Sequence, residues 1–185
     1  MKRKFLITAA MLLAEIFILA GCVKTEQLQA AQSFEQDLAG TIQLEDITLT
    51  VNATGTQNEV KPPEPYGYYN YYEEYEGYQY YVAAVTVKNN GDTSFDPNTC
   101  KVTAEMSDQS MADGKLVLLN EIDSDFIDTL DAGRECNGYL FVLAKEEAGI
   151  PEMINVYYNH GFAKKEEPEQ YDMRAVLLVA SLEKS

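Results

Sequence analysis

The sequence predicts an all-β protein, an antiparallel β-sandwich of about seven to nine short strands. Segments in which apolar and polar residues alternate recur along the chain, and turn residues separate them. No segment after residue 40 has a pattern long enough for a core helix. The length of 185 residues and the hydrophobic fraction of 46% suit one globular domain with accessory segments.

The alternating segments place the expected strands in chain order. The first has Ile47, Leu49 and Val51 on one face, opposite polar residues. The strongest strand is expected at 81–88 and ends in the turn residues Asn-Asn-Gly at 89–91. The remaining strands are expected at 100–106, 115–119, 126–130, 139–144, 154–158 and 175–180.

Residues 1–21 have the layout of a secretory signal peptide. Three positive charges precede an apolar run at 5–20, which is shorter than the roughly 20 residues of a stable transmembrane helix. Glu15 interrupts the run, and a carboxylate is costly in hydrocarbon. The ending Leu-Ala-Gly-Cys at 19–22 resembles the bacterial lipoprotein box, which implies that Cys22 is lipidated and becomes the mature N-terminus. An ordinary secretory signal, cut elsewhere, is the alternative.

The expected organisation has three parts. Residues 1–21 form the signal peptide, residues 22–39 the lipidated Cys and a polar tether, and residues 40–185 the sandwich. A docked helix is the alternative to the tether. Two acyl chains on Cys22 suffice for stable membrane anchoring, so the expected location is the extracytoplasmic face of the bacterial cell membrane.

The charge of the chain excludes one class of partner. Loss of residues 1–21 removes three positive charges and one negative charge, so the formal net charge changes from −16 to −18. Nucleic-acid affinity depends on clustered Lys and Arg, so we expect no nucleic-acid partner. An anionic membrane surface repels such a chain, and the lipid on Cys22 must hold the protein there.

Three segments occur in a familiar order: YVAAVTVKNN at 81–90, LDAG at 130–133 and GYLFVLA at 138–144. Together they resemble a telokin-like domain of unknown function that recurs in lipoproteins of Gram-positive bacteria. The resemblance covers about residues 40–159 and implies an immunoglobulin-like fold for the sandwich. That family is defined by its fold, so the resemblance assigns no catalytic residue and no cofactor.

The sharpest local feature is a tyrosine-rich insertion expected at 62–80, and nine of the 13 Tyr lie between 66 and 81. Tyr combines a flat apolar face with a hydroxyl and loses few rotamers when immobilised, which suits recognition surfaces. The expected partner is a cell-wall glycan or a surface protein, and a solvated, partly disordered insertion is the alternative. Tyr80 and Tyr81 are expected to be structural. The predicted ligand contacts are Tyr68, Tyr69, Tyr71, Tyr72 and Tyr75.

Cys100 and Cys136 remain after lipidation of Cys22, and an exported protein can oxidise them to a disulfide. Such a bond would close a loop of about 36 residues and stabilise the fold by roughly 3–4 kcal/mol. Two small buried apolar side chains are the alternative. Neither Cys has a second Cys or a His at metal-ligand spacing, so no metal site is expected.

The remaining polar candidates favour structural roles. The acidic residues between 123 and 131 lack the Gly of a calcium-binding loop, so a solvated turn is the preferred interpretation. His160 is the sole imidazole, and no nucleophile motif surrounds it. The acidic residues of this turn are Asp123, Asp125, Asp128 and Asp131.

Three functions follow as hypotheses. The first is a lipid-anchored, extracytoplasmic binding module that is not an enzyme, with the tyrosine-rich insertion at the contact. The second is a structural envelope lipoprotein without a specific ligand, in which the insertion is a spacer. The third is a carboxylate-based hydrolase, which requires two acids that converge in one pocket.

Overall fold

The computed structural model describes residues 28–35, 40–159 and 170–179. Cys22, His160 and the expected signal peptide lie outside the described residues. The described chain is all-β, which confirms the predicted fold class. No helix within these ranges is long and apolar enough to span a membrane. The strands are β1 (Gln29–Glu35), β2 (Thr41–Leu44), β3 (Ile47–Gln57), β4 (Tyr78–Asn89), β5 (Cys100–Met106), β6 (Met111–Leu119), β7 (Phe126–Ile127), β8 (Glu135–Lys145), β9 (Pro151–Tyr158) and β10 (Gln170–Leu178), with single 3-10 turns at η1 (Pro97–Thr99) and η2 (Glu146–Ala148).

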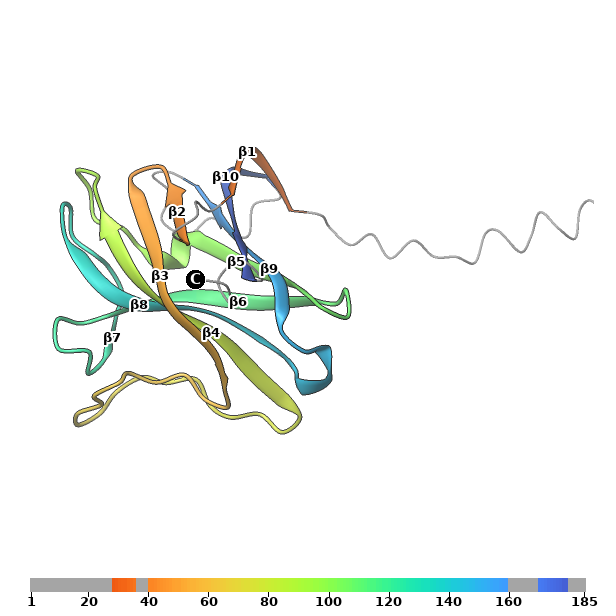
Figure 1. The fold of residues 1–185 in the computed structure, drawn as a ribbon. Coiled ribbons are helices and arrows are strands. Elements are labelled where there is room, and N and C mark those ends of the chain that lie inside the picture. Colours follow the sequence, from red (N-terminus) through yellow and green to blue (C-terminus); the bar gives the residue numbers. More distant parts are fainter. Residues whose placement is uncertain (1–27, 36–39, 160–169, 180–185) are drawn as a thin grey trace, which may run out of the picture.

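The strands form one hydrogen-bonded sheet that folds over into a sandwich. Their order is β1-β10-β9-β5-β6-β8-β4-β3-β2, and β7 pairs with β6 outside this path. β1 and β10 are parallel, and the other described pairings are antiparallel. Figure 1 shows the sheet curling around a common interior, and β2 at one end of the path contacts β10 near the other. The sandwich is therefore nearly closed into a barrel.

Side-chain alternation along the central strands separates an inner core from an outer face. On β4, Ala83, Val85 and Val87 lie in the inner core, whereas Tyr80 and Val82 belong to a second, smaller core on the opposite face. The inner core fills the space between the two layers of the sandwich. Its largest fully buried side chains include Ile42, Leu44, Leu49, Met106, Leu118, Leu140, Ile154 and Leu177.

The structure adds two strands to those expected, β1 and β2, and corrects the tether. The tether expected at 22–39 is wrong over residues 29–35, because these residues form β1. β1 exposes nearly all its side chains, so it has no alternating apolar pattern. Backbone pairing with the edge of β10 holds it in place, and such pairing leaves little trace in a sequence.

Asn89 joins two of the segments that carried the family resemblance. It ends β4, is 1% exposed, and its amide Nδ2 donates hydrogen bonds to the carbonyls of Leu130 (3.0 Å) and Thr93 (2.8 Å). Its backbone N–H donates to the carbonyl of Arg134 at 2.9 Å. The turn after β4 and the segment before β8 are thus fastened together by one buried side chain, because buried carbonyls require donors.

Candidate functional site

The loop between β3 and β4, residues 58–77, folds back on itself and is called the tyrosine hairpin below. Val60 and Tyr72 form a backbone bridge, with N–H to carbonyl distances of 3.0 and 2.8 Å. In Figure 1 the hairpin is the gold loop beneath the sheet. β4 begins at Tyr78, so the inserted segment ends earlier than the expected boundary of residue 80.

The root of the hairpin is buried against the outer face of β4, β6 and β8. Val60 is 0% exposed there, and the Tyr72 ring lies 4.7 Å from the Phe141 ring and 6.0 Å from the Phe126 ring. The Tyr80 hydroxyl donates to the carbonyl of Glu73 at 2.9 Å, which ties the hairpin to β4. Burial raises the pKa of the Tyr72 hydroxyl. The hairpin is therefore a packed element and not a free spacer.

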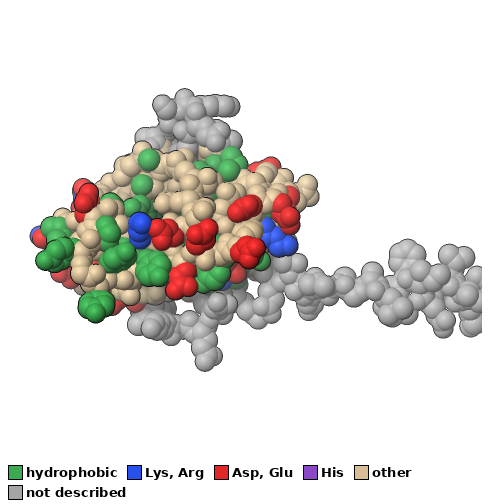
Figure 2. All heavy atoms as spheres, turned by 90° about the horizontal axis from the view of Figure 1, so that it is seen from below, with side chains coloured by type: hydrophobic (Ala, Val, Ile, Leu, Met, Phe, Trp, Pro, Cys, Tyr) green, Lys and Arg blue, Asp and Glu red, His purple; other side chains and the backbone are tan. Residues whose placement is uncertain are grey.

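The tip of the hairpin presents Tyr side chains to solvent. Tyr68 is fully exposed and Tyr66 is 85% exposed, whereas Tyr69, Tyr71 and Tyr75 are partly exposed. Figure 2 views the molecule from the hairpin side, and hydrophobic and acidic side chains intermingle on this face. Of the five predicted contacts, only Tyr72 packs against the second core, and its side chain is partly buried there. Tyr80 and Tyr81 are 2% and 5% exposed, which confirms their expected structural role.

Two grooves flank Tyr72. The first has a volume of about 370 Å³ and lies over the outer face of β6 and β8. The second has a volume of about 400 Å³ and reaches η1 and β7. In the first groove the Lys115 ammonium lies 5.2 Å from the centre of the Tyr72 ring. The first groove is lined in part by Tyr72, Tyr75, Tyr80, Lys115 and Phe141, and the second by Asn70, Tyr71, Tyr72, Phe126 and Asp128.

The acidic turn at 123–131 lies against the tyrosine hairpin, so two features that are far apart in the sequence meet. The N–H of Glu64 donates to the carbonyl of Asp123 at 3.1 Å, and the N–H of Asn70 donates to Oδ1 of Asp125 at 3.1 Å. The Asp123 carboxylate accepts from Nδ2 of Asn137 at 2.9 Å. These carboxylates serve separate hydrogen bonds, and no group of three His, Cys, Asp or Glu in the described ranges has a metal-binding arrangement.

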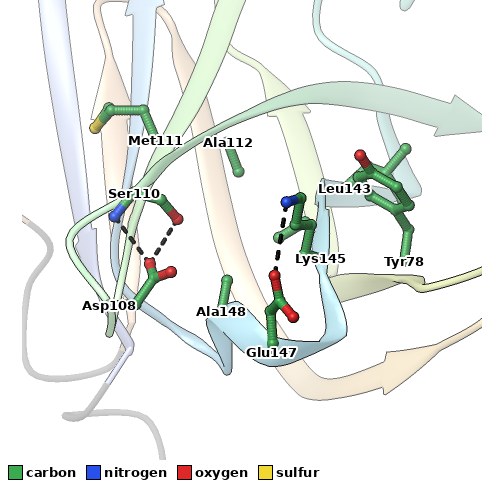
Figure 3. A pocket seen from close by; sticks show the side chains of 10 residues that line it. Tyr78, Asp108, Ser110, Met111, Ala112, Leu143, Lys145, Glu147 and Ala148 are labelled. Carbon is green, nitrogen blue, oxygen red and sulfur yellow. Dashed lines mark hydrogen bonds and ion pairs between the residues drawn. The ribbon is translucent and has the colours of Figure 1, made fainter.

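A further pocket, of about 320 Å³, lies between η2 and the start of β6 (Figure 3). Asp108 accepts hydrogen bonds from the N–H and the hydroxyl of Ser110, and Lys145 pairs with Glu147 at 3.6 Å. The Ser110 hydrogen bonds lower the pKa of the Asp108 carboxyl. A general acid of a glycosidase needs the opposite shift, so Asp108 does not have the raised pKa of that role.

The disulfide expected between Cys100 and Cys136 is absent, because both are free thiols. Cys100 begins β5 and Cys136 lies on β8, and β6 separates these two strands in the sheet. Two strand spacings amount to about 9.6 Å, beyond the usual Cα separation of a disulfide. Burial raises the pKa of the Cys100 thiol to about 12 and that of Cys136 to about 11. Both thiols are partly buried and pack against the inner core.

The outer-face residues beneath the hairpin, among them Lys115 and Phe141, were not predicted from the sequence. A usable signal exists in the run 139–144, which is apolar at every position. A strand with one face in water should alternate, so this run indicates that its outer face is covered. Which segment covers it is visible only in the fold.

The comparisons with known proteins concern fold and family. An uncharacterized β-sandwich protein of Clostridium difficile aligns with a TM-score of 0.58 at 13% identity, over 80% of this chain and 94% of that one. A candidate lipoprotein of Bacillus subtilis aligns with a TM-score of 0.40 at 13% identity, over 78% of this chain and 42% of that one. No curated protein matches the chain. The model of a domain of unknown function, DUF4352, matches residues 37–166, and the chain therefore belongs to the DUF4352 family.

Proposed function

We propose that the protein is a lipid-anchored, extracytoplasmic binding module whose contact surface is the exposed part of the tyrosine hairpin. One observation carries the proposal: Tyr66 and Tyr68 remain in water on a hairpin whose root is buried. Exposed apolar surface on a packed element is typical of an interaction site. A spacer has no need of such an anchored root.

The arrangement suits recognition because the hairpin backbone is held before any ligand arrives. The Val60–Tyr72 bridge and the packing of Tyr72 on Phe141 fix the loop, so binding would cost less ordering entropy. Tyr rings supply large contact areas at few rotamers. The separate pairing of Asp108 and Glu147 supports a binding role over a hydrolytic one.

The lipid anchor is proposed from the sequence of residues 1–22. Cys22→Ser should release the protein into the medium or leave the precursor unprocessed, because the acceptor thiol is lost. Metabolic labelling with a fatty acid and fractionation of membranes and medium measure both outcomes. Persistence of an acylated, membrane-bound form would contradict the assignment of Cys22.

The binding surface is tested by retention of the full chain, purified in detergent, on intact envelope from the host. Replacement of Tyr66, Tyr68 and Tyr71 with Ser should weaken retention about 10-fold or more, because exposed aromatic anchors dominate interfaces. The matched control replaces two exposed apolar residues elsewhere, Phe34 and Ile150, with Ser. Equal retention of both variants and the wild type would contradict a role of the hairpin in binding. Tyr72 is left intact, since its loss would disturb the second core.

A further inference from the structure

The tyrosine hairpin has a strong excess of negative charge. It holds five Glu and one Lys, and Nζ of that Lys61 already lies 2.6 Å from Oε1 of Glu59. Glu73, Glu74 and Glu76 are exposed and form no ion pair within the described part of the chain. Three carboxylates among exposed Tyr rings therefore face solvent without a compensating cation.

The acidic turn enlarges this negative field. Hydrogen bonds from Glu64 and Asn70 hold the hairpin against Asp123 and Asp125. Asp128 lines the second groove together with Tyr71. In Figure 2 red acidic side chains are scattered among the hydrophobic ones on this face, and blue basic ones are few. Carboxylates and aromatic rings thus share one continuous surface.

Two cation–π contacts within the described chain show that its Tyr rings already bind basic side chains. Nζ of Lys115 lies 5.2 Å from the centre of the Tyr72 ring within the first groove. On another part of the sheet, the Arg174 guanidinium lies 5.9 Å from the centre of the Tyr157 ring. The negative face of an aromatic ring attracts cations, and neighbouring carboxylates strengthen that attraction. The exposed rings of Tyr66 and Tyr68 offer the same face to a cation from outside.

We propose that the partner of the tyrosine hairpin is a cationic polypeptide segment, rich in Lys and Arg. This proposal rests on the binding role proposed above. The aliphatic stems of Lys and Arg would pack on the Tyr rings, and their charged ends would lie over the rings or beside Glu73, Glu74 and Glu76. Charge complementarity selects this occupant. A second copy of the chain would be repelled, as would an anionic polymer, because the net charge is −16 for the full chain and −18 without residues 1–21. An uncharged glycan would stack on the rings but leave the carboxylates unused.

The first test uses a fluorescent peptide of Lys, Arg and Gly as the probe and the full chain in detergent. The peptide should bind more tightly than a Gln-substituted peptide of equal length, and added salt should weaken its binding. The variant Glu73→Gln, Glu74→Gln, Glu76→Gln should bind it about 10-fold more weakly, equivalent to about 1.4 kcal/mol. A control with the same change in net charge, Glu35→Gln, Asp92→Asn, Glu152→Gln, should lose less than half of that binding free energy. These exposed acids lie on β1, in the turn after β4 and on β9, away from the hairpin. Equal losses in the two triple variants would overturn the assignment to the hairpin.

The second test uses Lys115, the cation already present in the first groove. Lys115→Met should strengthen binding of the cationic peptide, because it removes a like charge and vacates the Tyr72 ring. Weaker binding by this variant would overturn the proposal, since the loss of a like charge should not weaken a contact that depends on attraction between the peptide's cations and this surface.

The two proposals fail in distinguishable ways. If the cationic peptide binds no better than its Gln-substituted counterpart, the cationic partner is wrong. Retention on the envelope that still depends on Tyr66, Tyr68 and Tyr71 would then leave the binding role intact. Tyr-dependent binding of an uncharged wall oligosaccharide, unaffected by the Glu73, Glu74 and Glu76 substitutions, would identify a glycan and overturn the cationic partner.

Discussion

Replacement of Asn89 with Ala should destabilise the fold by about 3 kcal/mol, as the hydrogen bonds of its side chain indicate. Nδ2 donates to Thr93 and Leu130, and Oδ1 accepts from the N–H of Gly91 at 3.0 Å. The Leu130 carbonyl keeps the N–H of Phe95 as a donor at 2.9 Å, so it loses one of two partners. At about 1 kcal/mol for each of the three bonds, the sum is about 3 kcal/mol.

The measurement is urea unfolding of the full chain, followed by intrinsic Tyr fluorescence. In thermal unfolding the same change corresponds to a fall in Tm of about 6–12 °C for a chain of this size. Asn90→Ala is the matched control, because the exposed Asn90 makes one side-chain hydrogen bond, to Oγ1 of Thr48 at 3.0 Å. It should cost about 0.5 kcal/mol.

A second variant separates hydrogen bonding from lost volume. Asn89→Asp keeps the size of the side chain but points carboxylate oxygens at the carbonyls of Thr93 and Leu130, so it should destabilise at least as much as Ala. The reasoning would be refuted if Asn89→Ala and Asn90→Ala had equal unfolding free energies, or if Asn89→Asp matched the wild type.

Three further predictions concern packing, alkaline pH and the hairpin. Gly114→Ala should lower the free energy of unfolding in urea by about 2 kcal/mol or more. The added Cβ would lie 2.2 Å from the carbonyl oxygen of Phe141, so the two strands would have to separate. A neutral effect would contradict this close approach. The thiol pKa values of Cys100 and Cys136 are raised from 9.0 to about 12 and about 11 by burial, so the folded state holds these protons more tightly than the unfolded state. Their contribution to stability is complete below pH 9.0 and is lost as the pH rises towards about 12, so urea midpoints should fall in that window, and by less in a double Ala variant. Tyr72→Ala should expose the hairpin to limited proteolysis while Tyr72→Phe should not, because the ring carries the packing; equal cleavage rates would argue against an anchored hairpin.

Much of the inner core is predictable from alternation alone. A half-buried strand must place every second side chain in the interior, and Ala83, Val85 and Val87 do so on β4. The strand expected at 100–106 has the same bounds in the structure. Strand β1 escaped prediction because its stability comes from backbone pairing, to which its exposed side chains contribute no pattern.

Candidate sites are predictable in composition and not in arrangement. The concentration of Tyr between 66 and 81 is visible in the sequence. No sequence pattern distinguishes Tyr72 from its neighbours as the residue that packs on Phe141. The predicted disulfide was wrong for a related reason. Whether Cys100 and Cys136 come within bonding distance depends on strand order, and β6 lies between their strands.

By itself the sequence determined the all-β class, most strands and the acidic, Tyr-rich character of one segment, because periodicity and composition are local properties. The tertiary structure decided which surfaces meet. It packed the tyrosine hairpin on the outer face of β4, β6 and β8, and it brought the acidic turn against that hairpin. These contacts join residues 60 and 141, or 70 and 125, and only the pairing order of the sheet sets such long-range neighbours.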